Sequence, residues 1–85
     1  MILKLNNGKE LAIEWAGVAS LDGIFRIGFK GGDILKLTNL FSDKNNLPVT
    51  IYADGEPEGD FSRYTNFFGV SKRYDGSLIV SLAKE

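Results

Sequence analysis

Apolar and polar side chains alternate along most of this chain, and a period of two predicts β-strands. The clearest case is Ile24 to Lys30, where Phe25, Ile27 and Phe29 alternate with small or charged residues. The other segments that we expect to be strands are residues 2–5, 11–18, 49–53, 61–74 and 78–83. The pattern therefore predicts six strands.

Turn residues separate these strands. Asn6-Asn7-Gly8, Asp22-Gly23 and Asp75-Gly76 supply the Asn-Gly and Asp-Gly pairs that accept the positive φ angles of tight hairpin turns. Most neighbouring strands should therefore pair antiparallel.

One helix is expected near residues 33–42. Asp33 follows two glycines and stands where an N-cap accepts hydrogen bonds from the first free amides of a helix. The apolar residues Ile34, Leu37 and Phe41 then follow helical spacing, although Leu35 and Leu37 also alternate as in a strand. The helix should end before Pro48.

The order of elements, βββ-α-βββ, lacks the strand-helix-strand alternation of parallel sheets. It predicts a mainly β (α+β) single domain spanning residues 1–85, either a small six-stranded antiparallel sandwich or a partly open barrel whose open end the helix covers. The side chains on the apolar faces of the strands should form the core, namely Phe25, Ile27, Phe29, Ile51, Tyr64, Val80 and Leu82. Trp15 shares a face with Leu11 and Ile13 and is also assigned to the core.

The longest alternating segment, Phe61 to Tyr74, is predicted to be the central strand. Its even positions place Tyr64, Phe68, Val70 and Tyr74 toward the core. Phe67 then faces outward beside Arg63 and Thr65. Two explanations are open: a β-bulge at Gly69 returns Phe67 to the core, or Phe67, Arg63 and Thr65 bind a partner.

Composition narrows the classes of function. The 85 residues include no cysteine and no histidine, so thiolate metal sites, disulfides and the commonest general base are absent. A net charge of −1 lacks the positive excess that nucleic-acid backbones attract. No serine stands in a nucleophile elbow, and no apolar run reaches the length of a membrane span. We therefore expect a cytoplasmic protein that is not an enzyme, has no cofactor and binds neither nucleic acid nor membranes.

An acidic stretch is the one local pattern that suggests a cation. Its carboxylates, Asp54, Glu56, Glu58 and Asp60, alternate with Gly and Pro, and carboxylates on a loop can hold calcium. The helix-loop-helix calcium pattern requires a closing Glu where this chain has Thr65. We therefore expect a solvated hairpin loop and no bound metal.

The C-terminal half also carries a resemblance. The residues involved are Leu40-Phe41, Leu47, Ile51-Tyr52, Gly55-Glu56, Tyr64-Thr65, Ser71-Lys72, Tyr74 and the closing residues 80–85. In these positions the chain resembles small proteins encoded in phage and prophage tail-assembly regions of Gram-positive bacteria. The resemblance implies a component of the virion or of its assembly, with protein partners and no catalytic residues to transfer.

These observations favour a non-enzymatic structural or protein-interaction module that forms a homo-oligomer or binds the product of a neighbouring gene, and the resemblance implies an origin in a phage or prophage. The alternative is a module that binds a small ligand or a cation through residues 54–60 or through the mouth of a barrel. An enzyme is the third hypothesis.

Overall fold

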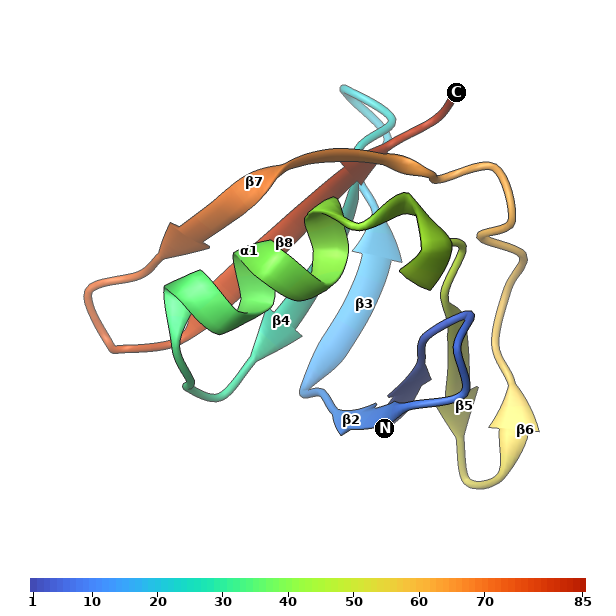
Figure 1. The fold of residues 1–85 in the computed structure, drawn as a ribbon, viewed down its shortest axis with the longest axis horizontal. Coiled ribbons are helices and arrows are strands. Elements are labelled where there is room, and N and C mark those ends of the chain that lie inside the picture. Colours follow the sequence, from blue (N-terminus) through green and yellow to red (C-terminus); the bar gives the residue numbers. More distant parts are fainter.

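The structure, a computed structural model, describes residues 1–85 and contains two antiparallel sheets of four strands each. The elements in chain order are β1 (Ile2–Lys4), β2 (Glu10–Ala12), β3 (Trp15–Val18), β4 (Phe25–Phe29), α1 (Ile34–Ser42), the 3₁₀ helix η1 (Lys44–Asn46), β5 (Thr50–Ala53), β6 (Glu56–Pro57), β7 (Asn66–Lys72) and β8 (Leu78–Ala83) (Figure 1). Sheet A has the order β2-β1-β5-β6, and sheet B has the order β3-β4-β8-β7. The mainly β prediction is confirmed, but the strands number eight, so the six-stranded arrangement was wrong in detail.

Of the two extra strands, one is β6, and the other arises because a bend divides the predicted strand 11–18 into β2 and β3. The Ile13 amide donates to the Met1 carbonyl at 3.1 Å, and the Glu14 amide donates to the Gly28 carbonyl at 2.8 Å. Successive amides of an extended chain point to opposite sides. The bend therefore passes the chain from sheet A to sheet B while both amides keep backbone partners.

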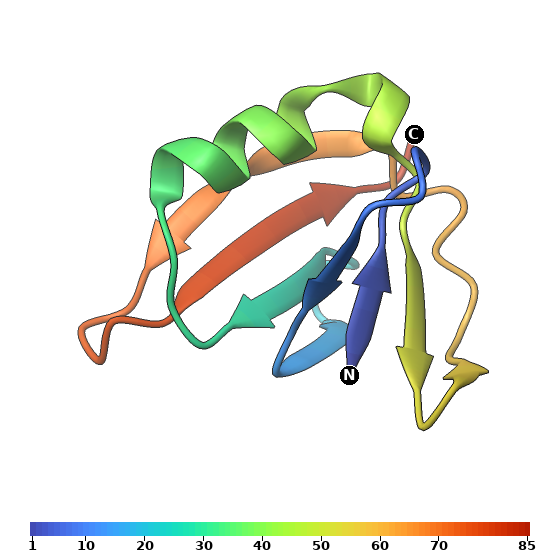
Figure 2. The same cartoon turned by 60° about the horizontal axis from the view of Figure 1, so that its bottom comes forward.

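The core lies between the two sheets and is completed by the helix. It contains 15 buried side chains, and these include the seven that were expected to form the core, Phe25, Ile27, Phe29, Ile51, Tyr64, Val80 and Leu82. Trp15, Phe68 and Tyr74, which were also expected to face the core, are exposed. Figure 2 shows α1 lying over β7 and β8, beside the strands of sheet A. Leu37 and Phe41 are buried beneath α1, and the Phe41 ring meets the Phe29 ring edge-on, with 6.1 Å between centroids.

The helix begins where the sequence predicts. The Asp33 side chain accepts hydrogen bonds from the amides of Leu35 and Lys36 at 2.8 and 3.3 Å. These bonds satisfy two amides that have no partner inside the helix. The predicted helix near 33–42 is thus confirmed, and the strand alternative for Leu35 and Leu37 was wrong.

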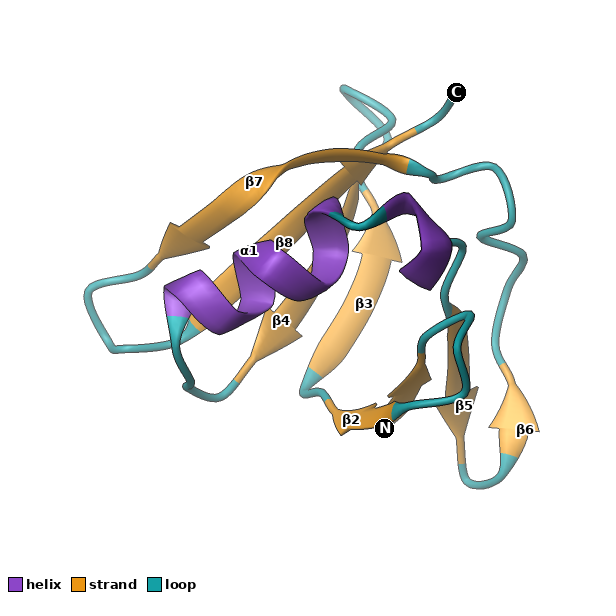
Figure 3. Ribbon diagram, in the orientation of Figure 1, coloured by secondary structure: helices purple, strands orange, loops and turns teal.

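The predicted central strand 61–74 is much shorter in the structure. Residues 58–65 form a connection between β6 and β7, and the strand begins only at Asn66 (Figure 3). Phe61 stacks on Phe25 with 4.0 Å between ring centroids, and Tyr64 lies 5.4 Å from Phe25. This connection therefore contributes aromatic rings to the core without any strand pairing of its own.

β7 is also an edge strand and not a central one, since it pairs only with β8. Its register contains a bulge: Phe67 pairs with Leu82 and Gly69 pairs with Ser81, so Phe68 has no partner. Gly69 has a φ of +152°, which side chains rarely accept. The bulge is the first of the two explanations that the sequence left open for Phe67.

The extra residue changes which aromatic side chain is buried. Phe67 is half-buried and packs against the core, as does Val70. Phe68 is 68% exposed, and Tyr74 lies fully exposed in the loop after β7. The predictions that Phe68 and Tyr74 face the core were wrong, because strict alternation fails at a bulge. For Phe67, the structure shows the return to the core that the sequence left open as one of two explanations.

Candidate interaction sites

The acidic stretch is divided among three kinds of local structure. Asp54 and Gly55 have φ angles of 52° and 81°, as in a two-residue hairpin turn, whereas Glu56 belongs to β6. Farther along, the Asp60 side chain accepts a hydrogen bond from the Ser62 amide at 3.0 Å, and this bond lowers the pKa of Asp60. No three carboxylates gather closely enough to hold a metal ion. The hairpin loop expected over the whole stretch is replaced by a tight turn, a short strand and a second loop.

The outer face of sheet A carries a row of apolar side chains. Ile2 pairs with Ala12 on one side and with Tyr52 on the other, and Tyr52 pairs with Pro57. Directly paired residues project from the same face of a sheet, so this row crosses all four strands. Ile2 is 38% exposed. The opposite face of the same strands contributes Leu3 and Ile51 to the core, so sheet A is apolar on both faces at this point.

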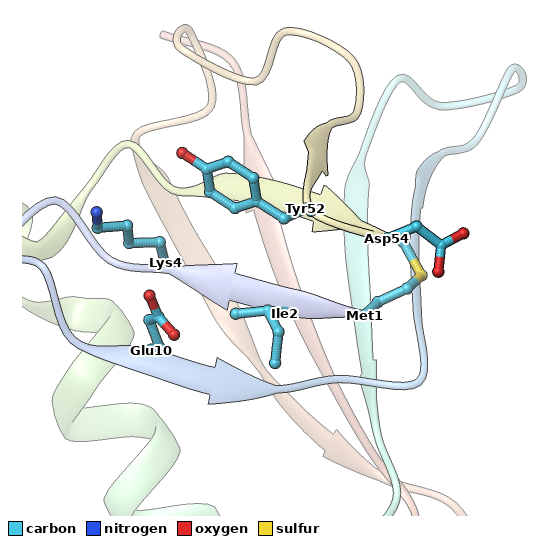
Figure 4. A pocket seen from close by; sticks show the side chains of 7 residues that line it. Met1, Ile2, Lys4, Glu10, Tyr52 and Asp54 are labelled. Atoms are coloured by element: carbon cyan, nitrogen blue, oxygen red, sulfur yellow. The ribbon is translucent and has the colours of Figure 1, made fainter.

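A shallow pocket of about 540 Å³ lies on this outer face. It is lined by Met1, Ile2, Lys4, Glu10, Tyr52, Asp54 and Gly55 (Figure 4). Lys4 and Glu10 pair across β1 and β2, and the close-up shows their side chains at the same end of the pocket. The only salt bridge of the structure joins Arg26 to Asp22, so neither Lys4 nor Glu10 is neutralised by an ion pair. We call this pocket and the apolar row the sheet A face.

Trp15 occupies the outer face of sheet B. A Cβ atom added to Gly28 would overlap Trp15 Nε1, so the indole rests directly on the glycine backbone. Trp15 remains 38% exposed. Its assignment to the core was wrong, because the bend at Ile13 and Glu14 separates it from the buried face of Leu11 and Ile13.

A second pocket involves two of the three residues that the sequence proposed for partner binding. It has a volume of about 310 Å³ and lies between the end of α1 and the start of β7. Its lining consists of Phe41, Ser42, Lys44, Thr65, Asn66 and Phe67. We call it the α1–β7 crevice. The hydroxyl oxygen of Thr65 is buried and has no hydrogen-bond partner.

Arg63 is not part of this crevice. Its carbonyl oxygen accepts the Glu85 amide at 3.0 Å, which ties the C-terminal residue to the 58–65 connection. The structure thus brings Phe67 and Thr65 together and leaves Arg63 exposed outside them. Partner binding by these three residues stays a prediction.

Except for Asp54, which the sequence suggested as a cation ligand, the residues of the sheet A face were not identified as a site from the sequence. A signal was present, because Ile2 and Tyr52 are apolar residues at positions opposite in parity to the buried Leu3 and Ile51. A strand that is apolar on both faces favours burial of its second face as well, either by another part of the chain or by another molecule. The sequence could not show that Ile2 and Tyr52 are neighbours, since their strands pair across almost fifty residues.

The architecture defines a mainly β protein of two joined antiparallel sheets with one covering helix. Comparisons with protein-family models, curated proteins and solved structures found no match to this chain. No helix has both the length and the apolar character required to cross a membrane.

Proposed function

We propose that this protein is a non-enzymatic structural or protein-interaction module that associates with a second copy of itself through the sheet A face. The observation that carries the proposal is the apolar row Ala12, Ile2, Tyr52 and Pro57 on the outer face of sheet A. Tyr52 is half-buried and the other three side chains are exposed. The row lies beside two charged residues of opposite sign, Lys4 and Glu10.

This pattern of charge favours a second copy as the partner. In a two-fold dimer the same surface is used twice, so a residue that contacts a second residue is contacted by it in return. Lys4 of one copy can then lie opposite Glu10 of the other, while Ile2 and Tyr52 pack at the centre. Stable complexes bury about 800 Å² on each partner, and strands of three or four residues offer a smaller face. We therefore expect a weak, concentration-dependent dimer.

Sedimentation equilibrium over a wide concentration range tests the proposal. Ile2→Arg should abolish the dimer, because it places a charge in the centre of the apolar row. Leu21→Arg is the matched control, since Leu21 is fully exposed in a distant loop and its replacement should leave the association constant unchanged.

Reversing the charges of Lys4 and Glu10 tests whether these two residues face each other across the dimer. Lys4→Glu and Glu10→Lys should each weaken association, and the double variant should restore it, because opposite charges again face each other. A protein that stays monomeric at millimolar concentration, or a dimer insensitive to Ile2→Arg, would contradict the proposal.

The resemblance of the C-terminal half supports a role as a virion or assembly component of a phage or prophage. Without such an origin, we propose that the protein acts in the cytoplasm. The partner would then include the product of a neighbouring gene as well as a second copy. Co-expression with the adjacent tail-region protein and co-purification of the two chains tests this part of the proposal. The Ile2→Arg variant shows whether both partners use the same face.

A further inference from the structure

We propose that one end of the molecule binds the surface of a membrane that contains anionic phospholipids. This end, which we call the basic end, consists of residues 30–36, at the start of α1, and residues 72–77, at the loop between β7 and β8. None of these residues belongs to the sheet A face, so membrane binding does not require self-association.

The pairing of the strands in sheet B brings the two segments of the basic end together. Leu78 pairs with Phe29 on one side and with Lys72 on the other, so β4 and β7 end where β8 begins. The loop between β4 and α1 also approaches β8, since a Cβ atom added to Gly32 would lie 3.7 Å from Leu78 Cδ1. Figures 1 and 2 both show the start of α1 and the β7–β8 loop at the left of the molecule, opposite β6.

The charge of the basic end favours an anionic partner. Its four cationic side chains, against two carboxylates, give a local charge of +2 in a chain whose net charge is −1, and they are Lys30, Lys36, Lys72 and Arg73. None of the four takes part in a salt bridge. The two carboxylates are bound within their own turns: Asp33 accepts the first amides of α1, and Asp75 accepts the amide and the hydroxyl of Ser77. The four cations therefore remain available to phosphate and carboxylate groups of lipids.

Apolar side chains project from the same end. Tyr74 is fully exposed at the tip of the β7–β8 loop, and Leu35 and Ile34 are 67% and 41% exposed at the start of α1. The loop is fixed by two backbone hydrogen bonds, from the Arg73 amide to the Ser77 carbonyl at 2.8 Å and from the Gly76 amide to the Arg73 carbonyl at 3.0 Å. A tyrosine with an apolar ring and a polar hydroxyl suits the boundary between lipid headgroups and acyl chains.

The shape of the basic end favours a bilayer over a protein or a nucleic acid. A protein partner is usually anchored by side chains that fill pockets, and no residue of this end lines any of the four pockets of the structure. Tyr74 is the one aromatic residue of this end, whereas single-stranded nucleic acids bind to several stacked rings. A bilayer accepts the side chains that a protein projects into it. The sequence predicted no membrane binding because no apolar run can span a bilayer, but binding to the surface requires no such run.

Co-sedimentation of the full chain with lipid vesicles tests the proposal. We expect the protein to bind vesicles of phosphatidylcholine and phosphatidylserine in a ratio of about 7 to 3, and to bind pure phosphatidylcholine at least about tenfold more weakly. Binding should be largely lost in about 0.5 M salt, because salt screens the attraction between the cations and the lipid headgroups.

A pair of charge reversals tests the position of the site. Lys72→Glu combined with Arg73→Glu should weaken binding at least about tenfold, since each cation near an anionic surface strengthens binding by about fivefold. The matched control is Lys9→Glu combined with Lys44→Glu, which makes the same change in net charge at exposed positions of the β1–β2 turn and of η1. The control should change binding by no more than about threefold.

The apolar contribution has its own pair of variants. Tyr74→Ser should weaken vesicle binding by about three- to tenfold without lowering the melting temperature, because the ring contacts nothing that stabilises the fold. Leu21→Ser is the control, since Leu21 is equally exposed in the β3–β4 loop at the opposite end of sheet B. Its vesicle binding should be unchanged.

Three results would overturn the proposal. They are equal binding to vesicles with and without phosphatidylserine, equal losses in the charge-reversed pair and its control, and tighter binding to a thymidine oligonucleotide than to the vesicles. The last of these would make the basic end a nucleic-acid site. None of the variants changes the sheet A face, so the association constant measured by sedimentation equilibrium should stay the same, and the two proposals fail independently.

Discussion

At the scale of single residues, one inserted position decides which of two adjacent phenylalanines belongs to the core. Phe67 and Phe68 have the same side chain and nearly the same local sequence, and strict alternation assigns Phe68 to the core. The bulge before Gly69 exchanges them. Truncation of Phe67 should therefore destabilise the protein more than truncation of Phe68, whereas strict alternation predicts the reverse order.

Alanine at each of these two positions measures that difference. We expect Phe67→Ala to lower the free energy of unfolding by about 1–3 kcal/mol, less than for a fully enclosed ring because Phe67 is half-buried. Phe68→Ala, at an exposed position, should change it by no more than about 0.5 kcal/mol. Urea unfolding followed by Trp15 fluorescence provides both values. If Phe68→Ala were the more destabilising variant, the bulge would be misplaced.

At the scale of elements, local chemistry specifies the helix better than the strands. The Asp33 side chain bonds two amides of the first turn, and the spacing of Leu37 and Phe41 directs one face of α1 toward the core. Both signals act within a few residues, so the sequence contains them in full. Strands depend on partners that lie elsewhere in the chain.

Replacement of the N-cap tests the helix signal. Asp33→Ala should lower the free energy of unfolding by about 1 kcal/mol, because the amides of Leu35 and Lys36 lose their acceptor. Asp33→Asn is the matched control, since its carbonyl oxygen can still accept both bonds, and it should cost only a few tenths of that amount. Chemical denaturation provides the comparison. Equal losses in the two variants would show that the charge of Asp33, and not its capping bonds, stabilises α1.

At the scale of the whole molecule, three aspartates in different loops have pKa values shifted in the same direction, below the ordinary value. The Arg26 side chain lowers the pKa of Asp22 through a hydrogen bond, and the Ser77 side chain and amide lower the pKa of Asp75. The pKa of Asp60 is lowered by the hydrogen bond that its side chain accepts from the Ser62 amide. Each of these aspartates therefore binds its proton more weakly in the folded protein than in the unfolded chain.

This difference predicts how stability depends on pH. A carboxyl group whose pKa is lower in the folded state stabilises the protein above its unfolded pKa, near 3.9, and loses that contribution as the pH falls through the folded value. The melting temperature should therefore decrease as the pH is lowered from about 4 to about 2. The double variant Asp22→Asn with Asp75→Asn should show a smaller decrease. A melting temperature that stayed constant over this range would contradict the assignment.

Short-range chemistry determined much of this fold from the sequence alone. Alternation placed the buried faces of β4, β5 and β8, the Asp-Gly and Asn-Gly pairs placed the turns, and Asp33 placed the start of α1. These features result from backbone sterics and hydrogen bonds between residues a few positions apart, so the sequence is sufficient for them.

Only the tertiary structure decided the remaining features. The bend at Ile13 and Glu14, the edge position of β7 and the bulge before Gly69 each depend on which strands pair. The sheet A face and the α1–β7 crevice likewise arise where residues far apart in the chain meet. Such pairings are selected by the packing of the whole core, and a period of two contains no information about the partner of a strand or about one additional residue within it.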